Sequence, residues 1–435
     1  MEIKIEDVSS TRKTATVTVP ASKISELRNK IISQYAAQAR VPGFRPGKTP
    51  AAIIRQRYGK EIEKELLQSV VQEAYAGARE EKSIEIYSLV DVGEPKIEDG
   101  RDAEIRLEID IVPAFTLPEY KGIEVPAADT SVSDADIAAA VEGLRKQRAE
   151  FKKIDDAASA GDYVKLSYEG KIDGEAFPEI ASVYGKQTGT WEEAGAEDAL
   201  GASVKEIAAA LVGMKAGDKK EITVTFAADF VNEALRGKTA IYTLDVAEVR
   251  QRVLPELDEK FFKSLQVADE SEMKKQVRDG LEANKKNAAR SKTRETIIAK
   301  LNEMVDFDLP QSAIDRESQN IFYEFANSQL RQGVKLEEIE AKRDELLDDT
   351  KDAAKTRVKT QLILNAIAKA EGVKVEDADI TNRIRQEAYI SGMEPDKFAK
   401  ELTKNRSRII EMQANIRYNK ALDIVVAAAK EVATK

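Results

Sequence analysis

The stretch Val41-Pro42-Gly43-Phe44-Arg45-Pro46-Gly47-Lys48-Thr49-Pro50 decides how the first part of the chain folds. Its prolines and glycines exclude both a continuous helix and a strand. Apolar residues at helical spacing lie on both sides of it: Ile24, Leu27, Ile31, Ile32 and Tyr35 before, and Ile53, Ile54, Ile62, Leu66 and Leu67 after. We therefore predict a helical hairpin with this stretch at its tip. Thr49 is the expected N-cap of the second helix and Pro50 its first residue.

The expected tip carries an aromatic side chain, Phe44, beside two cations, Arg45 and Lys48. From Leu27 to Lys60 there is no Asp or Glu, and the positive charges are Arg28, Lys30, Arg40, Arg45, Lys48, Arg55, Arg57 and Lys60. Because the whole chain has a formal net charge of -10, this is a basic segment in an acidic protein. It favours an anionic partner, and phosphate backbones are the commonest one. The alternative is a solvated helix surface with a chance bias in charge.

The tip sequence also resembles a known family. Gly43-Phe44-Arg45-Pro46-Gly47-Lys48-Thr49-Pro50, followed by Arg57-Tyr58-Gly59, is similar to the ribosome-binding signature of the trigger factor family of bacterial chaperones. That pattern is Gly-Phe-Arg, one variable residue, Gly, two residues and Pro, and the chain keeps every fixed position. The resemblance implies contact with the ribosome by the tip residues Gly43, Phe44, Arg45, Pro46, Gly47 and Lys48. It also implies nascent or unfolded polypeptides as partners, and a homodimer away from the ribosome.

Composition excludes several classes of site. The chain of 435 residues has no Cys and no His, which excludes disulfides, thiolate chemistry, Ser-His-Asp triads and His-bound metals. No signal-peptide core follows Met1, and no apolar run is long enough to span a membrane, so we expect a cytoplasmic protein without a membrane partner. Gly43-x-x-x-Gly47-Lys48-Thr49 is one residue too short for a phosphate-binding loop and follows a helix, not a strand. We therefore expect no nucleotide and no other cofactor.

The order of patterns predicts an α+β multidomain protein. Alternating apolar residues predict strands at 2–8, 13–19 and 103–112 around the helical hairpin, so residues 1–112 form the first, α+β domain. Residues 113–157 are a proline-containing connector and a helix over 133–150, capped by Ser133, which packs with the C-terminal domain. Residues 158–250 are β-rich, and residues 251–435 are helical.

The β-rich segment resembles FKBP-type prolyl isomerases. The matching pieces include Gly161-Asp162-Tyr163-Val164, Tyr168-Glu169-Gly170, Asp173-Gly174-Glu175-Ala176-Phe177 and Leu211-Val212-Gly213-Met214-Lys215-Ala216-Gly217-Asp218. By this resemblance the catalytic pocket is lined by Tyr168, Phe177, Val204, Ile207 and Tyr242, with Phe226 and Phe230 nearby. The family's Ile-Pro-Gly-Phe-Glu segment is Val204-Lys205-Glu206-Ile207-Ala208 here, so an Ile replaces the aromatic floor. Reduced isomerase activity and a fold kept only for binding both remain open.

The C-terminal part is dominated by amphipathic helical patterns, predicted at 268–304, 310–331, 336–370, 376–390, 394–402 and 404–431. In trigger factors such a tail, with the helix before the isomerase domain, forms a cradle. Most apolar residues of the tail must pack helix on helix, while some line the cradle; the set includes Ile321, Phe322, Phe325, Leu362, Ile363 and Leu364. Sequence alone does not sort the two groups.

Three functions are compatible with these patterns. The first is an ATP-independent chaperone that docks at the ribosomal exit tunnel and shields nascent chains. The second is primarily a prolyl isomerase whose other domains deliver substrate. The third is a nucleic-acid-binding module that uses the basic hairpin.

Overall fold

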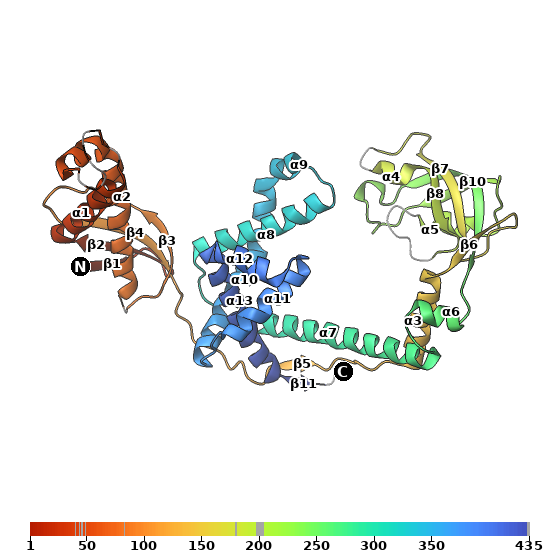
Figure 1. Cartoon of the computed structure of the whole chain (residues 1–435). Helices are drawn as coiled ribbons and strands as arrows, with labels where there is room; N and C mark the ends of the chain where they lie inside the picture. The colour runs from red at the N-terminus through yellow and green to blue at the C-terminus, as the bar shows by residue number, and fades with distance from the viewer. Residues whose placement is uncertain are drawn as a thin grey trace. The chain divides into compact units, whose positions relative to one another are not determined.

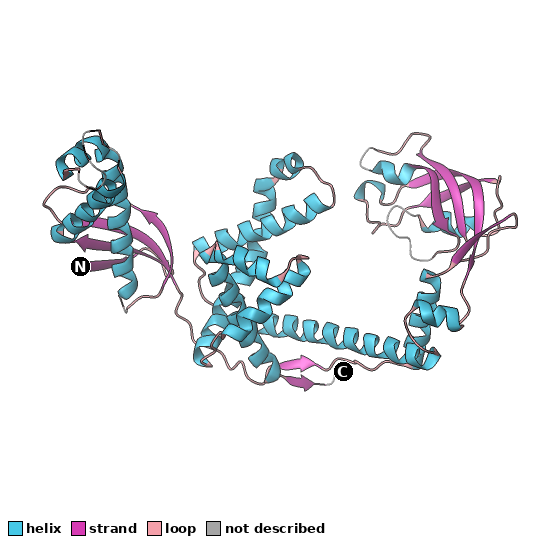
Figure 2. Ribbon diagram, in the orientation of Figure 1, coloured by secondary structure: helices cyan, strands magenta, loops and turns pink. Residues whose placement is uncertain are grey.

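The computed structural model describes all residues except 40, 43, 45, 46, 48, 82, 179–180, 197–203 and 433–435. The chain divides into two compact units, one of residues 1–128 with 290–435 and the other of residues 129–289. Figures 1 and 2 show their helices and strands. The predicted α+β multidomain class is confirmed, since an α+β part, a β-rich part and a helical part follow one another along the chain.

The first unit begins with a four-stranded antiparallel sheet in the order β1-β2-β4-β3. Its elements are β1 (Glu2–Asp7), β2 (Arg12–Val19), α1 (Ala21–Gln38), α2 (Ala51–Glu80), β3 (Ile86–Val92) and β4 (Ala103–Ile111). Alternate residues of the central strands, such as Val17 and Leu107, are buried with Ile54, Leu66 and Val70 of α2. The predicted strands and the helical hairpin are therefore confirmed, and the hairpin covers one face of the sheet.

The predicted cap of the second hairpin helix is wrong. Pro50 is the N-cap, with an extended backbone (φ -59°, ψ 143°), and the helix begins at Ala51. Thr49 therefore lies one position too early for its hydroxyl to reach the free amides of the first turn. Its Oγ1 is buried and has no partner within the described part of the chain. Proline here precedes the helix instead of starting it.

The helical part of the first unit packs in several apolar clusters, one of which is a core shared by three of its helices. Its helices are the second half of α7 (Glu270–Met304), α8 (Gln311–Arg331), α9 (Leu336–Ala341), α10 (Arg343–Ala370), α11 (Asp377–Ile390), α12 (Pro395–Thr403) and α13 (Arg406–Ala427). Ile297, Ile363, Leu364 and Leu422 are buried together in that core. The helix predicted over 336–370 is interrupted at Lys342, whose φ of -108° and ψ of 12° are not helical.

The last predicted helix is too long. It ends at Ala427, and β11 (Lys430–Val432) pairs in parallel with β5 (Glu124–Pro126) of the connector. A three-residue strand has no readable period, and its partner lies about three hundred residues away, so only the folded chain reveals the pairing. The C-terminal segment thereby holds the connector against the helical core.

The second unit begins with α3 (Asp134–Gln147), capped by Ser133 as predicted. The Ser133 hydroxyl accepts from the Asp136 amide, and the Asp136 carboxylate accepts from the Ser133 amide. The buried face of α3, Ile137 and Val141, packs against α6 (Glu259–Ser264) and the first turn of α7.

A twisted antiparallel sheet follows in the second unit. Its strands are β6 (Glu150–Ile154), β7 (Tyr163–Ile172), β8 (Lys186–Glu193), β9 (Lys219–Thr225) and β10 (Thr239–Val253), with α4 (Ser182–Gly185), α5 (Lys205–Leu211) and the 3₁₀ helix η2 (Glu233–Leu235) between them. The order is β6-β10-β7-β8, and β9 pairs with the first half of β10. Because Glu150 lies opposite Val253, the chain enters and leaves this sheet at neighbouring positions.

Candidate functional site

The hairpin tip presents an aromatic ring to solvent. Phe44 is 39% exposed, whereas Val41, in the segment after α1, is buried in the core of the α+β part. The Gly47 amide donates to the Ala36 carbonyl at 3.0 Å, and the φ of Gly47 is +81°, which L side chains rarely adopt. The tip is thus tied back to α1 while Phe44 stays outside. Of the other predicted tip residues, Gly43, Arg45, Pro46 and Lys48 lie outside the described residues.

The basic segment divides into paired and unpaired cations. Arg28 forms ion pairs with Glu63 and Asp99, so its charge is balanced locally. Other cations are exposed, and for these no ion pair is found within the described ranges: Lys30, Arg55, Arg57 and Lys60. The Arg57 guanidinium lies 6.0 Å from the ring centroid of Tyr58, which in turn packs on Tyr35. The structure therefore leaves a net positive surface along the hairpin.

The predicted pocket residues are brought together in the second unit. Tyr168 and Tyr242 come from the adjacent strands β7 and β10, Phe177 from the loop after β7, and Val204 and Ile207 from the start of α5. All five belong to one apolar cluster, and four are buried, with Phe177 half-buried. The residues from 197 to 203, directly before Val204, lie outside the description.

The rings of the cluster pack on one another at tilted or edge-to-face angles. The ring centroids of Tyr168 and Tyr242 are 5.9 Å apart, and those of Phe177 and Tyr242 are 5.8 Å apart. Phe226 and Phe230 extend this packing, with centroids 4.8 Å apart, as the sequence predicted. Tyr184, which sequence analysis missed, packs on Phe230 at 5.4 Å. Tyr184 lies in the four-residue helix α4, which is too short to show a pattern.

Two glycines make this ring packing possible. A Cβ atom on Gly170 would lie 2.5 Å from the Tyr242 ring, and one on Gly185 would lie 2.8 Å from Phe177. Both distances are far shorter than a van der Waals contact. Gly170 belongs to the matching piece Tyr168-Glu169-Gly170, and the close approach of the Tyr242 ring is the physical reason for a glycine there.

The electrostatics of the cluster are those of an uncharged site. Burial raises the pKa of Tyr168 to about 12, and burial also raises the pKa of Tyr242. The Tyr242 hydroxyl donates to the Tyr184 carbonyl at 2.9 Å. Both phenols are therefore neutral near pH 7, and the site offers apolar walls instead of an acid or a base. No cluster suited to holding a metal ion is found among the residues that the structure describes.

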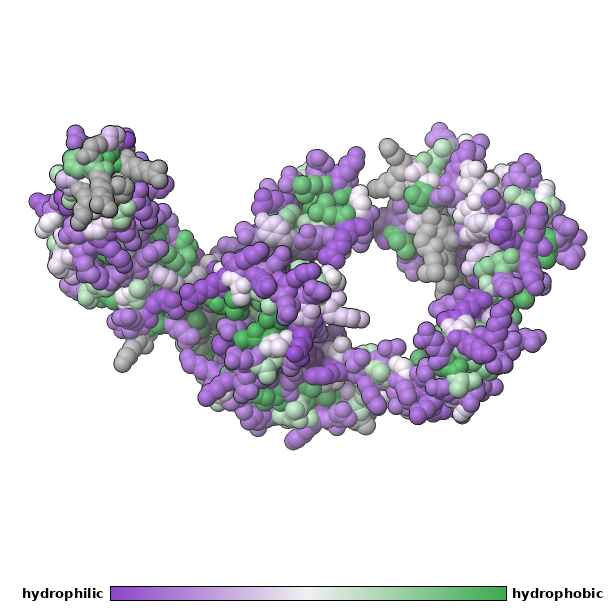
Figure 3. Space-filling view, viewed as in Figure 1, coloured by the Kyte–Doolittle hydropathy of each residue, from purple (hydrophilic) through white to green (hydrophobic). Residues whose placement is uncertain are grey.

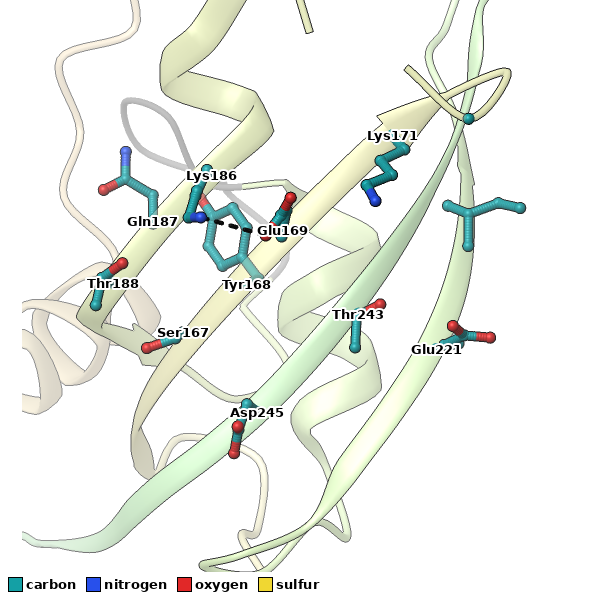
Figure 4. A pocket seen from close by; sticks show the side chains of 12 residues that line it. Ser167, Tyr168, Glu169, Lys171, Lys186, Gln187, Thr188, Glu221, Thr243 and Asp245 are labelled. Carbon is teal, nitrogen blue, oxygen red and sulfur yellow. Dashed lines mark hydrogen bonds and ion pairs between the residues drawn. The ribbon is translucent and has the colours of Figure 1, made fainter. Parts of the chain in front are cut away.

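The opposite face of the same sheet is polar and hollowed. A hollow of about 510 Å³ lies over β7, β8, β9 and β10, and Tyr168 of the aromatic cluster is among the residues that line it. Figure 4 shows Ser167, Glu169 and Lys171 along β7, with Lys186 pairing with Glu169 at 3.2 Å. The sheet thus has an apolar cluster on one face and a hollow lined mainly by polar residues on the other, and Tyr168 contributes to both.

The structure sorts the apolar residues of the helical part. Phe322, Leu362, Ile363 and Leu364 are buried, so they pack helix on helix, whereas Phe325 is 41% exposed. Further exposed apolar side chains are Tyr323, Leu330, Leu336, Tyr389, Ile390 and Ile410. Figure 3 shows hydrophobic residues at the surface where α8 ends and α9 follows. None of the described helices has an apolar stretch long enough to cross a lipid bilayer.

Comparison with known families covers nearly the whole chain. Residues 1–144 match the model of the bacterial trigger factor protein, and residues 271–427 match the model of its C-terminus. A trigger factor of Opitutus terrae is 38% identical over 433 residues, covering 99% of this chain and 98% of the relative. The chain belongs to the trigger factor family.

Two further sequence matches agree with membership of the trigger factor family. Residues 155–247 match the FKBP-type peptidyl-prolyl cis-trans isomerase model, between the two trigger factor models. A trigger factor of Halalkalibacterium halodurans is 30% identical, covering 99% of this chain and 100% of the relative. A solved structure from work on promiscuous substrate recognition by the trigger factor chaperone is 22% identical, covering 98% of this chain and 99% of that one, with a TM-score of 0.47. The chain is a trigger factor chaperone with an FKBP-type domain.

Proposed function

We propose that the chain docks on the ribosome through the hairpin tip and shields nascent polypeptides on its helical part without a nucleotide. The exposed ring of Phe44, at the tip of a hairpin whose helices carry exposed cations without ion pairs among the described residues, carries this proposal. A buried aromatic at this position would be a core residue, and an exposed one beside positive charge fits a docking contact. The ring supplies apolar contact area, and the cations supply attraction to phosphate.

The charge distribution supports docking along the hairpin as well as at its tip. Arg28 is already neutralised by two carboxylates, so it contributes little to an external partner. Lys30, Arg55 and Arg57 are exposed on α1 and α2. Cations that face phosphates release counterions on docking, so the contact is expected to depend on salt.

Docking is tested with Phe44→Ala, Arg45→Ala and Lys48→Ala combined in the full chain. We expect loss of co-sedimentation with ribosomes and an unchanged circular dichroism spectrum, because Phe44 is exposed. The matched control is Val90→Ala, Lys96→Ala and Arg101→Ala, which also removes one exposed apolar side chain and two cations from the same α+β part. Equal binding by the tip variant and the control would contradict ribosome docking through the tip.

Shielding of unfolded chains would use exposed apolar side chains of the helical part. Tyr389 and Ile390, 88% and 75% exposed at the end of α11, are the most exposed of them. Dispersed apolar contacts hold an unfolded segment weakly, and the segment leaves when it can bury its own apolar surface.

A deletion tests whether shielding of unfolded chains needs the β-rich domain. We propose to replace residues 150–253 with a flexible linker, because β6 and the end of β10 are paired and belong to one insert. Arg145 donates to the Pro255 carbonyl at 2.9 Å, so the two chain ends beside the insert are already held together. Light scattering of a proline-independent client during dilution from denaturant should show retained protection. A folded deletion variant that protects no better than buffer would place client binding in the deleted domain.

The second activity that we propose is prolyl isomerisation at the aromatic cluster. Rotation about an X-Pro bond has a barrier of about 18–20 kcal/mol, because resonance holds the amide planar. An apolar, water-poor site disfavours the more polar planar amide and favours the twisted one. Neutral Tyr168 and Tyr242, with Phe177, supply such walls without acid or base. Ile207 in place of an aromatic floor predicts a rate below that of family members with the ring.

Isomerisation is tested on a short X-Pro peptide with the full chain. Phe177→Ala is expected to remove most of the activity, because Phe177 is half-buried against Tyr242 and Phe226. Phe151→Ala is the matched control, since Phe151 is an exposed ring on the strand β6 of the same sheet. Equal activity of both variants would show that the cluster is not the catalytic site.

A ribosome-docked chaperone works in the cytoplasm, which is the location we propose. We also propose homodimerisation away from the ribosome, which sedimentation equilibrium of the full chain would test. A single species of 48.1 kDa at every concentration would contradict it.

A further inference from the structure

One end of the FKBP-type sheet carries aromatic rings and guanidinium groups on the face that is turned away from the isomerase pocket. The residues are Phe151 of β6, Tyr163 and Lys165 of β7, Trp191 of β8, and Arg250 and Arg252 of β10. We refer to them as the aromatic–cationic face. The proposed isomerisation and ribosome docking use none of them.

Strand register places these side chains on one face. Arg252 lies opposite Phe151, Arg250 lies opposite Tyr163, and Lys165 lies opposite Trp191. Directly opposite residues of antiparallel strands point to the same side of a sheet, and so do residues two apart along a strand. Val164, between Tyr163 and Lys165, and Val249, next to Arg250, are buried in the core with the isomerase cluster. The rings and cations therefore face outward together.

The rings and guanidinium groups alternate in contact. The Arg250 guanidinium lies 4.6 Å from the centroid of the Trp191 ring, and that of Arg252 lies 5.0 Å from Tyr163. Phe151 packs edge to face on Tyr163 at 4.9 Å and is 42% exposed. The side chain of Arg250 is 43% exposed. The Phe151 ring and the Arg250 side chain, which ends in a planar guanidinium, thus each contact a neighbouring ring and are partly exposed to solvent.

Cations outnumber carboxylates on this face. Arg250 pairs with Glu248 at 2.7 Å, and Arg252 pairs with Glu193. Lys165, and Lys153 opposite Arg250, add charge, and within the described residues neither forms an ion pair. Planar stacking groups beside unpaired lysines on an open antiparallel sheet are the elements with which proteins hold unpaired bases and phosphates.

We propose that the aromatic–cationic face binds single-stranded RNA. One base stacks on the Phe151 ring and a neighbouring base on the Arg250 guanidinium, while Lys153 and Lys165 meet the phosphates. The duplex is excluded because its bases are already stacked and paired. The choice of RNA as the nucleic acid rests on the proposed ribosome docking, which brings the chain beside RNA. The stacking geometry does not depend on that docking.

The test uses the full chain with the triple substitution at the tip and with Lys30, Arg55 and Arg57 also changed to Ala, so that the cations of the hairpin contribute little binding. A fluorescein-labelled RNA of twelve uridines is titrated and its anisotropy measured, alongside the fluorescence of Trp191, the only tryptophan of the chain. We expect binding that quenches Trp191, because the base on Arg250 lies next to that ring. Phe151→Ala and Arg250→Lys should each weaken binding at least about five-fold, the effect of one lost base stack.

The controls separate stacking from charge and from the tip. Arg250→Lys keeps the positive charge but removes the planar guanidinium group on which a base would stack. Unchanged affinity in that variant would therefore overturn the proposal. Ile241→Ala, at an exposed position of the same strand and face, should leave affinity unchanged. The proposal would be overturned if duplex RNA bound as tightly as the single-stranded RNA of twelve uridines. It would also be overturned if a proline-rich peptide quenched the fluorescence of Trp191 and the RNA did not. Because the ribosome is absent from this assay, a lack of RNA binding would not affect the result of the co-sedimentation test for ribosome docking.

Discussion

The hairpin tip and the isomerase cluster both use aromatic rings, in opposite environments. Phe44 is exposed at the tip of a hairpin whose helices carry cations without ion pairs among the described residues, and its site reads directly from ten consecutive residues. Tyr168 and Tyr242 are buried beside Phe177, which comes from a separate loop, and they are neutral. An exposed ring with cations suits reversible docking on an anionic surface, whereas buried neutral rings suit a site that excludes water. The same residue type therefore serves binding or catalysis according to burial and charge.

The largest expected difference between the two regions is in stability. Tyr242→Ala should lower the free energy of unfolding of the FKBP-type domain by about 3–5 kcal/mol, because it leaves a cavity in a packed core. Phe44→Ala should change that of the α+β part by less than about 0.5 kcal/mol, since its ring is partly in solvent. Urea unfolding of the full-length variants, followed by circular dichroism, measures both. Similar losses in the free energy of unfolding in the two variants would contradict this difference between the two regions.

Salt should separate the two regions next. If docking uses about three phosphate contacts, ribosome affinity should fall about 20- to 40-fold between about 50 and 200 mM salt. Isomerase activity on an uncharged X-Pro peptide should change less than about two-fold, because the rings of the cluster carry no charge near pH 7. Co-sedimentation and peptide isomerisation at the same salt concentrations give the two curves. If ribosome affinity depended on salt concentration as little as isomerase activity does, a phosphate partner would be excluded.

Alkaline pH should test the buried phenols. The pKa of Tyr168 is raised to about 12 in the folded chain, so its contribution to stability is complete below about pH 10 and is lost as pH rises towards 12. Between pH 8 and 11 the parent chain should therefore lose about 1.4 kcal/mol more than Tyr168→Phe. Urea unfolding at both pH values is the measurement. An equal loss in parent and variant would show that Tyr168 is accessible to solvent.

The smallest expected effect concerns the pocket floor. Ile207→Phe should raise isomerase activity about two- to five-fold, because a ring face adds contact with proline. Ile207 is buried at 2% exposure, so the variant needs a check of its thermal midpoint. Ile207→Leu, which keeps the volume without a ring, is the control and should leave activity unchanged. Equal isomerase rates for Ile207→Phe and Ile207→Leu would show that a ring at the pocket floor does not contribute to catalysis.

Local patterns predicted the regular elements well where they were long. The hairpin helices, the alternating strands β2, β4 and β7, and most helices of the C-terminal part follow from apolar periodicity. Short or weakly patterned elements were missed, among them β8, α6 and β11. The Thr49 cap was wrong because a proline is common on either side of a helix start, and only the backbone angles of Pro50 decide which.

The two sites also differ in how much of each could be predicted from the sequence. The roles of Gly43, Phe44, Arg45 and Lys48 at the tip stay predictions, since docking has not been measured and three of these residues lie outside the description. Pocket residues were named through a family resemblance, and their meeting in one cluster depends on strand pairing between β7 and β10. Tyr184 carried no signal, because its contact with Phe230 joins two short segments.

By itself the sequence determined the order of the domains, the helical hairpin with its basic tip, and the absence of Cys and His chemistry. These properties depend on neighbouring residues and on composition, which a linear reading captures. Only the tertiary structure decided which apolar residues of the helical part are exposed, how β11 pairs with β5, and which rings share a face of the FKBP-type sheet. The reason is physical: burial, strand register and ring contacts depend on residues far apart in the chain, and only folding brings them within contact distance.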